Sequence, residues 1–282
     1  MSTMPIEREL APLAADLPSG DAQALRTLNA PGSFSARILS ARFSSIDLLM
    51  VTLWSAMMLM ALFVPGMRFL QLSLLSGGVL VGRHIWSVVY RGETRDGNLE
   101  LAVLLPVFGV FSTAAFTFVT RATPVTYDSL LAKWDMGFAP MVRTWALAHP
   151  MAMDPAVWVY RCLPISILLV LCTTTGRTRS RLVWSLYLGA FLSLVWYLIF
   201  PAVGPIHVGD PSAPRNCMPS MHLTWTLLLF VNSKGWVKWA AGIFAALTAF
   251  ATLATGEHYY PDLIAALPWA WVITLMARKW AK

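Results

Sequence analysis

The sequence has few charged residues: Asp, Glu, Lys and Arg together make up 12% of the chain. Soluble domains carry about a quarter charged residues, and they do not bury an apolar fraction as large as the 57% found here. The shortage of charge excludes an ordinary soluble protein. It predicts an all-α polytopic membrane bundle whose helices span about 20 residues each.

Two further shortages narrow the class of protein. The three cysteines, Cys162, Cys172 and Cys217, show no metal or redox spacing, so we interpret two as packing thiols and one as a loop thiol. Residues 1–45 lack the basic start, apolar run and cleavage site of a secretory signal. We expect them to form a cytoplasmic N-terminal tail.

The basic residues lie in the loops between the apolar runs, where Lys and Arg determine the orientation of a membrane protein. The net charge is +7, but its distribution over short loops argues against a nucleic-acid partner. Eight apolar segments predict about eight transmembrane helices, at residues 47–64, 68–90, 99–120, 156–174, 182–200, 220–233, 236–255 and 261–278.

Charge sets the predicted orientation. If the spans alternate, 15 of the 21 Lys and Arg residues fall on the side of the N-terminus. The positive-inside rule makes that side cytoplasmic and places both termini there. We expect an integral protein of the plasma (inner) membrane, with its active site on the outer, periplasmic or lumenal face.

Two segments on the outer side exceed ordinary loop length. Residues 121–155 mix apolar, aromatic and charged residues, which favours amphipathic helices lying in the membrane interface. Residues 201–219 hold five prolines and are therefore expected to be irregular. Long irregular segments inside a compact protein are often functional.

Two short motifs on the outer side carry the candidate chemistry. Pro219-Ser220-Met221-His222 opens the sixth span, and Gly256-Glu257-His258-Tyr259-Tyr260-Pro261-Asp262 leads into the eighth. His258 and Asp262 stand four residues apart, so they share a helix face and can touch. A carboxylate on one imidazole nitrogen leaves the other free to attack, and a helix start at His222 suits an anion. These residues favour phosphoryl transfer.

The rival interpretation is a metal site, but His222, His258 and Asp262 lack a tight ligand spacing, so we expect no metal and no cofactor.

At these motifs the chain resembles the type-2 phosphatidic acid phosphatase superfamily. PSMH at 219–222 is similar to the second signature of that superfamily, and HYYPD at 258–262 to the end of the third. The resemblance implies that His222 is the general acid, His258 the nucleophile that forms a phosphohistidine, and Asp262 its partner. It also implies a six-helix catalytic core over 93–282, with two extra spans over 46–92.

The chain departs from the usual pattern of cations. The first signature, a Lys followed by an Arg-Pro, is absent, and Ala251-Thr252 replaces the Ser-Arg expected before His258. The pattern is closer to the inositol phosphorylceramide synthase branch. The resemblance lies in the Gly204-Pro205 loop and in the Tyr127-Asp128 segment. That branch transfers a headgroup between lipids and does not merely hydrolyse a phosphate ester.

Other residues are needed to hold the substrate. Of the outer-side cations, those that can hold the phosphate are Arg215, Arg161, Arg143 and Lys133, and Arg215 ranks first because it precedes His222 in the irregular loop. The remaining candidates are Asn216, whose amide can donate a hydrogen bond to a phosphate oxygen, and Tyr127, Asp128 and Asp135, which bind a headgroup or cap helices. His207 and Glu257 are weaker candidates.

The sequence thus predicts an integral membrane phosphotransferase that moves a phosphate-ester headgroup between lipids, with a membrane lipid and the bilayer as its partners. A lipid phosphatase of the same superfamily is the first alternative. A non-catalytic membrane lipid-binding protein is an alternative of another class. The oligomeric state is not indicated.

Overall fold

The computed structural model describes residues 47, 49–56, 68–91, 103, 107, 111 and 114–280. The chain divides into two units, Met1–Val107 and Phe108–Lys282. The predicted tail, the second half of the first span and much of the third lie outside the described residues.

In the first unit, the described parts of the two predicted spans are helical. Residues 49–56 form one helix, and α5 (Arg68–Trp86) runs into the π-helical segment η1 (Ser87–Arg91). The two pack together: Asp47 Oδ1 lies 3.4 Å from His84 Nε2, and Trp54 lies against Gly78.

The second unit carries both candidate motifs. Residues 114–122 are helical, and a chain of helices follows. The elements are α7 (Asp128–Asp135), α8 (Phe138–Ala148), α9 (Pro150–Arg161), α10 (Leu163–Thr173), α11 (Gly176–Ile199), the 3-10 turn η2 (Pro205–His207), α12 (Met221–Asn232), α13 (Gly235–Thr255) and α14 (Tyr260–Trp280). Over the described ranges there are helices and no strand, which confirms the all-α expectation.

Several of these helices are long and apolar enough to cross a bilayer. In the described part of the chain α11, α13 and α14 meet this test, and α9 with α10 adds a fourth if the bent pair forms one span. The shorter α12 is also apolar. The chain therefore has the helical membrane fold that its composition predicts, and the described residues supply up to four of the expected eight spans.

The predicted span at 156–174 is wrong as a single helix. It is two helices, α9 and α10, which meet at Cys162 with a bend of 55°. Pro164 explains the break, because a proline has no N–H to bond the carbonyl four residues earlier, and its ring clashes with that carbonyl. Apolar content alone did not reveal this bend.

The last three helices match the predicted spans closely, since α12, α13 and α14 begin and end within two residues of them. By contrast α11 begins at Gly176, six residues before the predicted start. Its first turns contain arginines, whose long side chains can reach the headgroup region while the backbone stays helical.

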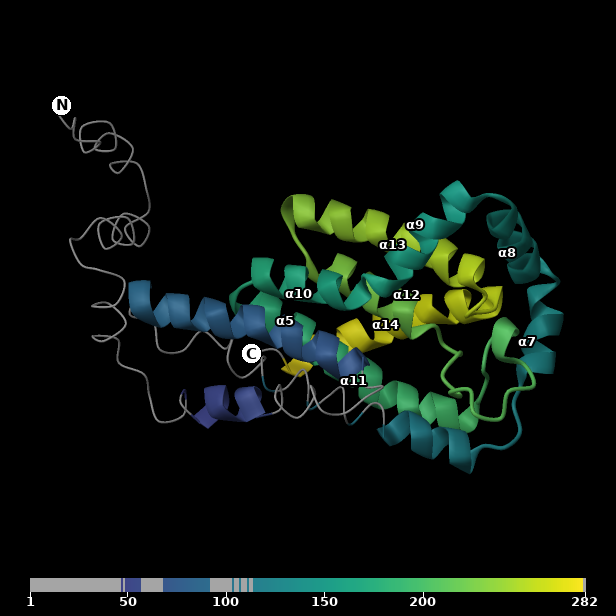
Figure 1. Cartoon of the computed structure of the whole chain (residues 1–282), viewed down its shortest axis with the longest axis horizontal. Helices are drawn as coiled ribbons and strands as arrows, with labels where there is room; N and C mark the ends of the chain where they lie inside the picture. The colour runs from purple at the N-terminus through teal and green to yellow at the C-terminus, as the bar shows by residue number, and fades with distance from the viewer. Residues whose placement is uncertain are drawn as a thin grey trace. The chain divides into compact units, whose positions relative to one another are not determined.

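The helix α12 packs against α10, α11, α13 and α14. Its inward residues Leu228 and Leu229 contact core residues of these neighbours, among them Leu171, Leu182 and Ile273. In Figure 1, α12 lies amid the other helices, and α7 and α8 lie at the end of this unit where the loop 201–219 also runs. Because α12 is surrounded by protein, its first turn is fixed in position.

Two aspartates attach α7 to this end of the unit. The Asp128 carboxylate accepts hydrogen bonds from the backbone N–H groups of Val203 (3.2 Å) and Gly204 (3.1 Å). Asp135 accepts from the N–H groups of Ala139 (2.9 Å) and Tyr260 (2.7 Å). The segment 121–155 is thereby connected both to the irregular loop and to the start of α14.

The loop 201–219 approaches the turn before α14 at Gly204. Gly204 has φ +88° and ψ 159°, a conformation that essentially only glycine adopts. A Cβ built there would clash with the carbonyl oxygen of Glu257. Only a residue without a side chain allows the loop to lie this close to the His258 turn.

This contact predicts the effect of replacing Gly204. Gly204→Ala should destabilise the protein by about 1–3 kcal/mol from backbone strain alone, and the clash with Glu257 adds to it. Gly209→Ala is the matched control, because Gly209 also has positive φ (+92°) but would meet nothing within 4 Å. We expect the midpoint of thermal unfolding, followed by tryptophan fluorescence, to fall at least about 3 °C further for Gly204→Ala. Equal shifts for the two variants would contradict the close approach.

Candidate active site

The turn that carries His258 joins the two last helices. The helix α13 ends with Gly256 in the left-handed conformation (φ +79°), and the N–H groups of Gly256 and Glu257 bond back to the carbonyls of Leu253 and Thr252. The chain then passes through His258 into α14. This ending reverses the chain direction and leaves His258 just outside the helix.

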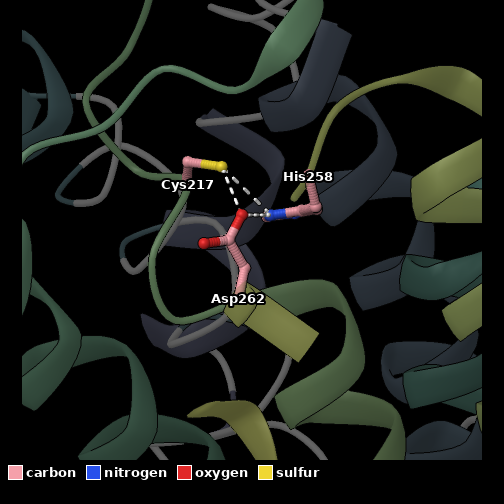
Figure 2. Close-up of side chains that lie close together, drawn as sticks. All are labelled: Cys217, His258 and Asp262. Atoms are coloured by element: carbon pink, nitrogen blue, oxygen red, sulfur yellow. Dashed lines mark hydrogen bonds and ion pairs between the residues drawn. The ribbon is translucent and has the colours of Figure 1, made fainter. Parts of the chain in front are cut away.

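Asp262 lies in the first turn of α14, where it is fully buried. Its Oδ2 accepts hydrogen bonds from Cys217 Sγ (2.7 Å) and Tyr259 N (2.8 Å) and lies 3.5 Å from His258 Nδ1. Figure 2 shows the three side chains converging on this one oxygen. The predicted contact between His258 and Asp262 is therefore present, with Nδ1 as the engaged nitrogen.

Cys217 is a member of this cluster that the sequence interpretation missed. Its Sγ also lies 3.4 Å from His258 Nδ1 and 3.4 Å from the carbonyl of Glu257. Burial raises the pKa of the Cys217 thiol well above its ordinary value, and the charge of Asp262 raises it further. The thiol therefore stays protonated and donates to Asp262. In the sequence, its closeness to the site is indicated only by its position two residues before Pro219, where the motif of His222 begins.

Cys217, His258 and Asp262 are also residue types that bind metals, and their ligand atoms all lie within 4.8 Å of one another. The 2.7 Å between Cys217 Sγ and Asp262 Oδ2 is a hydrogen-bond distance. Two such ligands on one tetrahedral zinc ion would stand roughly 3.5 Å apart. The cluster as placed thus shares protons, and the expectation of a metal-free mechanism stays a prediction.

His222 comes to the same place from α12. Ser220 is the N-cap of this helix, its Oγ accepts from Leu223 N (3.4 Å), and its own N–H donates to the backbone carbonyl of Asp262 (3.2 Å). The ring centroids of His222 and His258 are 6.4 Å apart. The structure thus brings together the three residues predicted to be catalytic.

Tyr160 is a second neighbour that the sequence did not identify. Its ring stacks on His222, with centroids 3.9 Å apart and planes 17° from parallel. Tyr160 stands near the end of α9, and nothing in its local sequence distinguishes it from other interfacial aromatics. The stack holds the plane of the His222 ring.

The sequence ranked Arg215 first among the cations that could hold the phosphate, but in the structure its guanidinium binds backbone carbonyls. The side chain is buried, and its guanidinium donates to the carbonyl of Ala213 (2.6 Å) and, at 3.4 Å each, to those of Thr123, Asp210 and Pro211. These bonds attach the irregular loop to residue 123. Asn216 beside it is half-buried.

The other predicted binding residues divide into two groups. Asp135 accepts from N–H groups at the starts of α8 and α14, so it caps these helices, which was one of the two roles left open, whereas Asp128 binds N–H groups of the loop. Burial, with the charge of Asp128, also raises the pKa of Tyr259. Tyr127 stacks on Phe200 at the surface, with ring centroids 4.5 Å apart. Lys133 and Arg161 are exposed.

The two weaker candidates pair with each other. His207 Nε2 lies 3.2 Å from Glu257 Oε2, and both side chains are about one-third exposed. Glu257 directly precedes His258, so this pair forms a second connection between the loop 201–219 and the turn that carries His258.

Comparison with known families agrees with this site. Residues 207–276 match the family model of the PAP2 superfamily, a span that contains both histidines and Asp262 but only about a quarter of the chain. The match supports the superfamily and lipid phosphatase or phosphotransferase chemistry; the inositol phosphorylceramide synthase branch stays a prediction. No curated protein and no solved structure matches the chain.

The state of Cys217 gives a prediction about its reactivity. Because its pKa is raised, thiolate is scarce, and N-ethylmaleimide at about pH 8 should leave Cys217 unmodified in the folded protein. Mass spectrometry should find it modified only after denaturation. Cys162, which is half-buried, is the internal control. Labelling of Cys217 as fast as Cys162 in the folded protein would rule out a buried, protonated thiol.

Proposed function

We propose that this chain is an integral membrane phosphotransferase that moves a phosphate-ester headgroup between lipids through a phosphohistidine on His258. One observation carries the proposal: Asp262 holds Nδ1 of His258 at the mouth of α14, while His222 stands at the adjacent start of α12. Nε2 of His258 is then the nitrogen available for attack. Displacement at phosphorus needs a nucleophile, a carboxylate that orients it and a second group that transfers a proton. The site offers these groups as His258, Asp262 and His222.

In the first step, Nε2 of His258 attacks the phosphorus of the lipid donor, and the bond from phosphorus to the lipid oxygen breaks. The negative charge of the bound donor phosphate favours the protonated form of His222, and that proton passes to the leaving oxygen, so the lipid leaves as a neutral alcohol. Asp262 stabilises the positive charge that develops on the His258 ring. The products of this step are a lipid alcohol and a covalent headgroup phosphohistidine.

In the second step, the hydroxyl of an acceptor lipid attacks the phosphorus from the side that the alcohol has left. His222, now neutral, takes the acceptor's proton as the phosphorus–nitrogen bond breaks. Both histidines return to their starting states. The N–H groups at the start of α12 can help to balance the charge of the phosphoryl oxygens.

Burial of the site favours a lipid acceptor over water. Asp262 is 0% and His258 4% exposed, so little of the catalytic pair meets solvent. The helices next to them expose large aromatic residues, among them Trp134, Trp145 and Trp158, which suit contact with lipid at headgroup depth. A dry site beside an apolar surface supports transfer.

A lipid phosphatase is the second candidate, because it uses the same residues and differs only in accepting water. The family match favours it as much as transfer, since the superfamily chemistry includes both. A non-catalytic lipid-binding protein would retain the fold without needing the contact between His258 and Asp262.

One assay tests these alternatives. The purified protein in lipid nanodiscs receives phosphatidylinositol labelled in its headgroup, together with a lipid alcohol, and the label is followed into new phospholipid or into water-soluble products. We expect new phospholipid and diacylglycerol. His258→Ala should lower the rate by about 10³-fold or more, and His222→Ala by about 10²–10⁴-fold.

The control is His149→Ala, which removes an exposed histidine next to Trp145 and should keep the parent rate. Label released only as soluble phosphate ester would replace the transferase with the phosphatase. A His258→Ala protein as active as the parent would exclude both enzymes.

A further inference from the structure

Arg143 on α8 lies directly against the catalytic turn. A Cβ built on Gly256 would stand 2.9 Å from Arg143 Cδ and 3.1 Å from its Nε, so the side chain runs along the backbone two residues before His258. The residue is half-buried. The absence of a side chain at Gly256 leaves the space that Arg143 occupies.

The guanidinium of Arg143 has an unused donor. Its Nε–H is buried and has no hydrogen-bond partner within the described residues. A charged group with an unmade buried bond is unfavourable, and in native structures such a group is explained by strain, a water, an ion or a catalytic role. An anion next to the His258 turn would supply the missing acceptor.

The other outer-side cations considered for the phosphate are less suited to this place. Arg215 already donates to four backbone carbonyls. Lys133 and Arg161 are exposed, and no contact connects their side chains to His222, His258 or Asp262 in the part of the chain that the structure describes. Arg143 combines a fixed position beside the catalytic turn with a free N–H.

We propose that Arg143 binds the phosphate of the substrate while His258 attacks it, in place of the Lys and Arg that the sequence lacks. This inference rests on the proposed function. A guanidinium presents parallel N–H groups that match two non-bridging phosphate oxygens, and its charge offsets the charge on those oxygens in the transition state. Arg143 is thus a substrate-binding residue for an anionic lipid phosphate ester.

The helix α8 is suited to bring such a lipid to the site. Met141 is 59% and Trp145 50% exposed on the same helix, while Arg143 between them contacts the turn. One helix therefore offers an apolar surface for acyl chains and a cation for the phosphate. We expect the headgroup phosphate to sit between α8 and His258.

The test uses the full-length protein in nanodiscs with headgroup-labelled phosphatidylinositol, and it also measures inhibition by orthovanadate, an analogue of a phosphoryl group in transfer. Arg143→Gln should lower kcat/KM by about 10²-fold and weaken vanadate inhibition by about 10-fold or more. Arg143→Lys should recover part of both, since it restores the charge without the fork. Arg121→Gln removes an exposed cation and is the matched control.

The outcomes separate this inference from the proposed function. If the parent is active, His258→Ala is inactive, and Arg143→Gln has the kcat/KM and vanadate inhibition of Arg121→Gln, then Arg143 does not bind the phosphate and the function stands. If the parent transfers and hydrolyses nothing, the proposed function fails first. If Arg143→Gln fails to fold, Arg143→Lys decides between the outcomes. Vanadate inhibition and kcat/KM equal to those of the parent in that variant would show that the guanidinium of Arg143 does not bind the phosphate through two N–H groups.

Discussion

Asp262 holds together segments that are far apart in the sequence. Its Oδ2 accepts from Cys217 in the loop 201–219 and from the N–H of Tyr259, and it orients His258. Its backbone carbonyl accepts from Ser220 at the start of α12. Asp262 has no exposed surface, so it depends on these neighbours: those of the carboxylate all engage Oδ2, whereas Oδ1 is buried without a hydrogen-bond partner among the described residues. The loop, the turn and the two helix starts are therefore arranged around one residue, whose side chain and backbone carbonyl both take part, and this places the two histidine rings 6.4 Å apart, centroid to centroid.

A second set of contacts surrounds this centre. Asp128 and Asp135 fix α7 to the loop and to α14, and Arg215 ties the loop to residue 123. Gly204 and Gly256 let backbone and side chains approach the turn from two sides. In a chain with only 14 acidic residues, at least three are thus used to position the site. In these cases, charged side chains that the sequence offers as substrate ligands bind backbone groups of the protein. Arg143, by contrast, keeps a donor without a partner among the described residues.

Local patterns in the sequence predicted the parts of the molecule that local physics determines. Hydropathy and chain breaks placed α12, α13 and α14, and the four-residue spacing paired His258 with Asp262. The bend at Cys162 was missed because hydropathy does not register Pro164 as a break. Cys217 and Tyr160 were missed because they reach the histidines only through tertiary packing, across 41 residues in the case of Cys217 and His258. The superfamily resemblance supplied the roles, which spacing alone leaves open.

Trapping the covalent intermediate on His258 would show directly whether this residue is the nucleophile. Phosphatidylinositol with radiolabelled phosphorus is mixed with the protein without an acceptor, and the reaction is stopped with alkali, in which a phosphohistidine survives. We expect label on the peptide that contains His258, loss of that label in acid, and no label in His258→Ala. Label that persists in His258→Ala, or that is stable to acid, would contradict this role of His258.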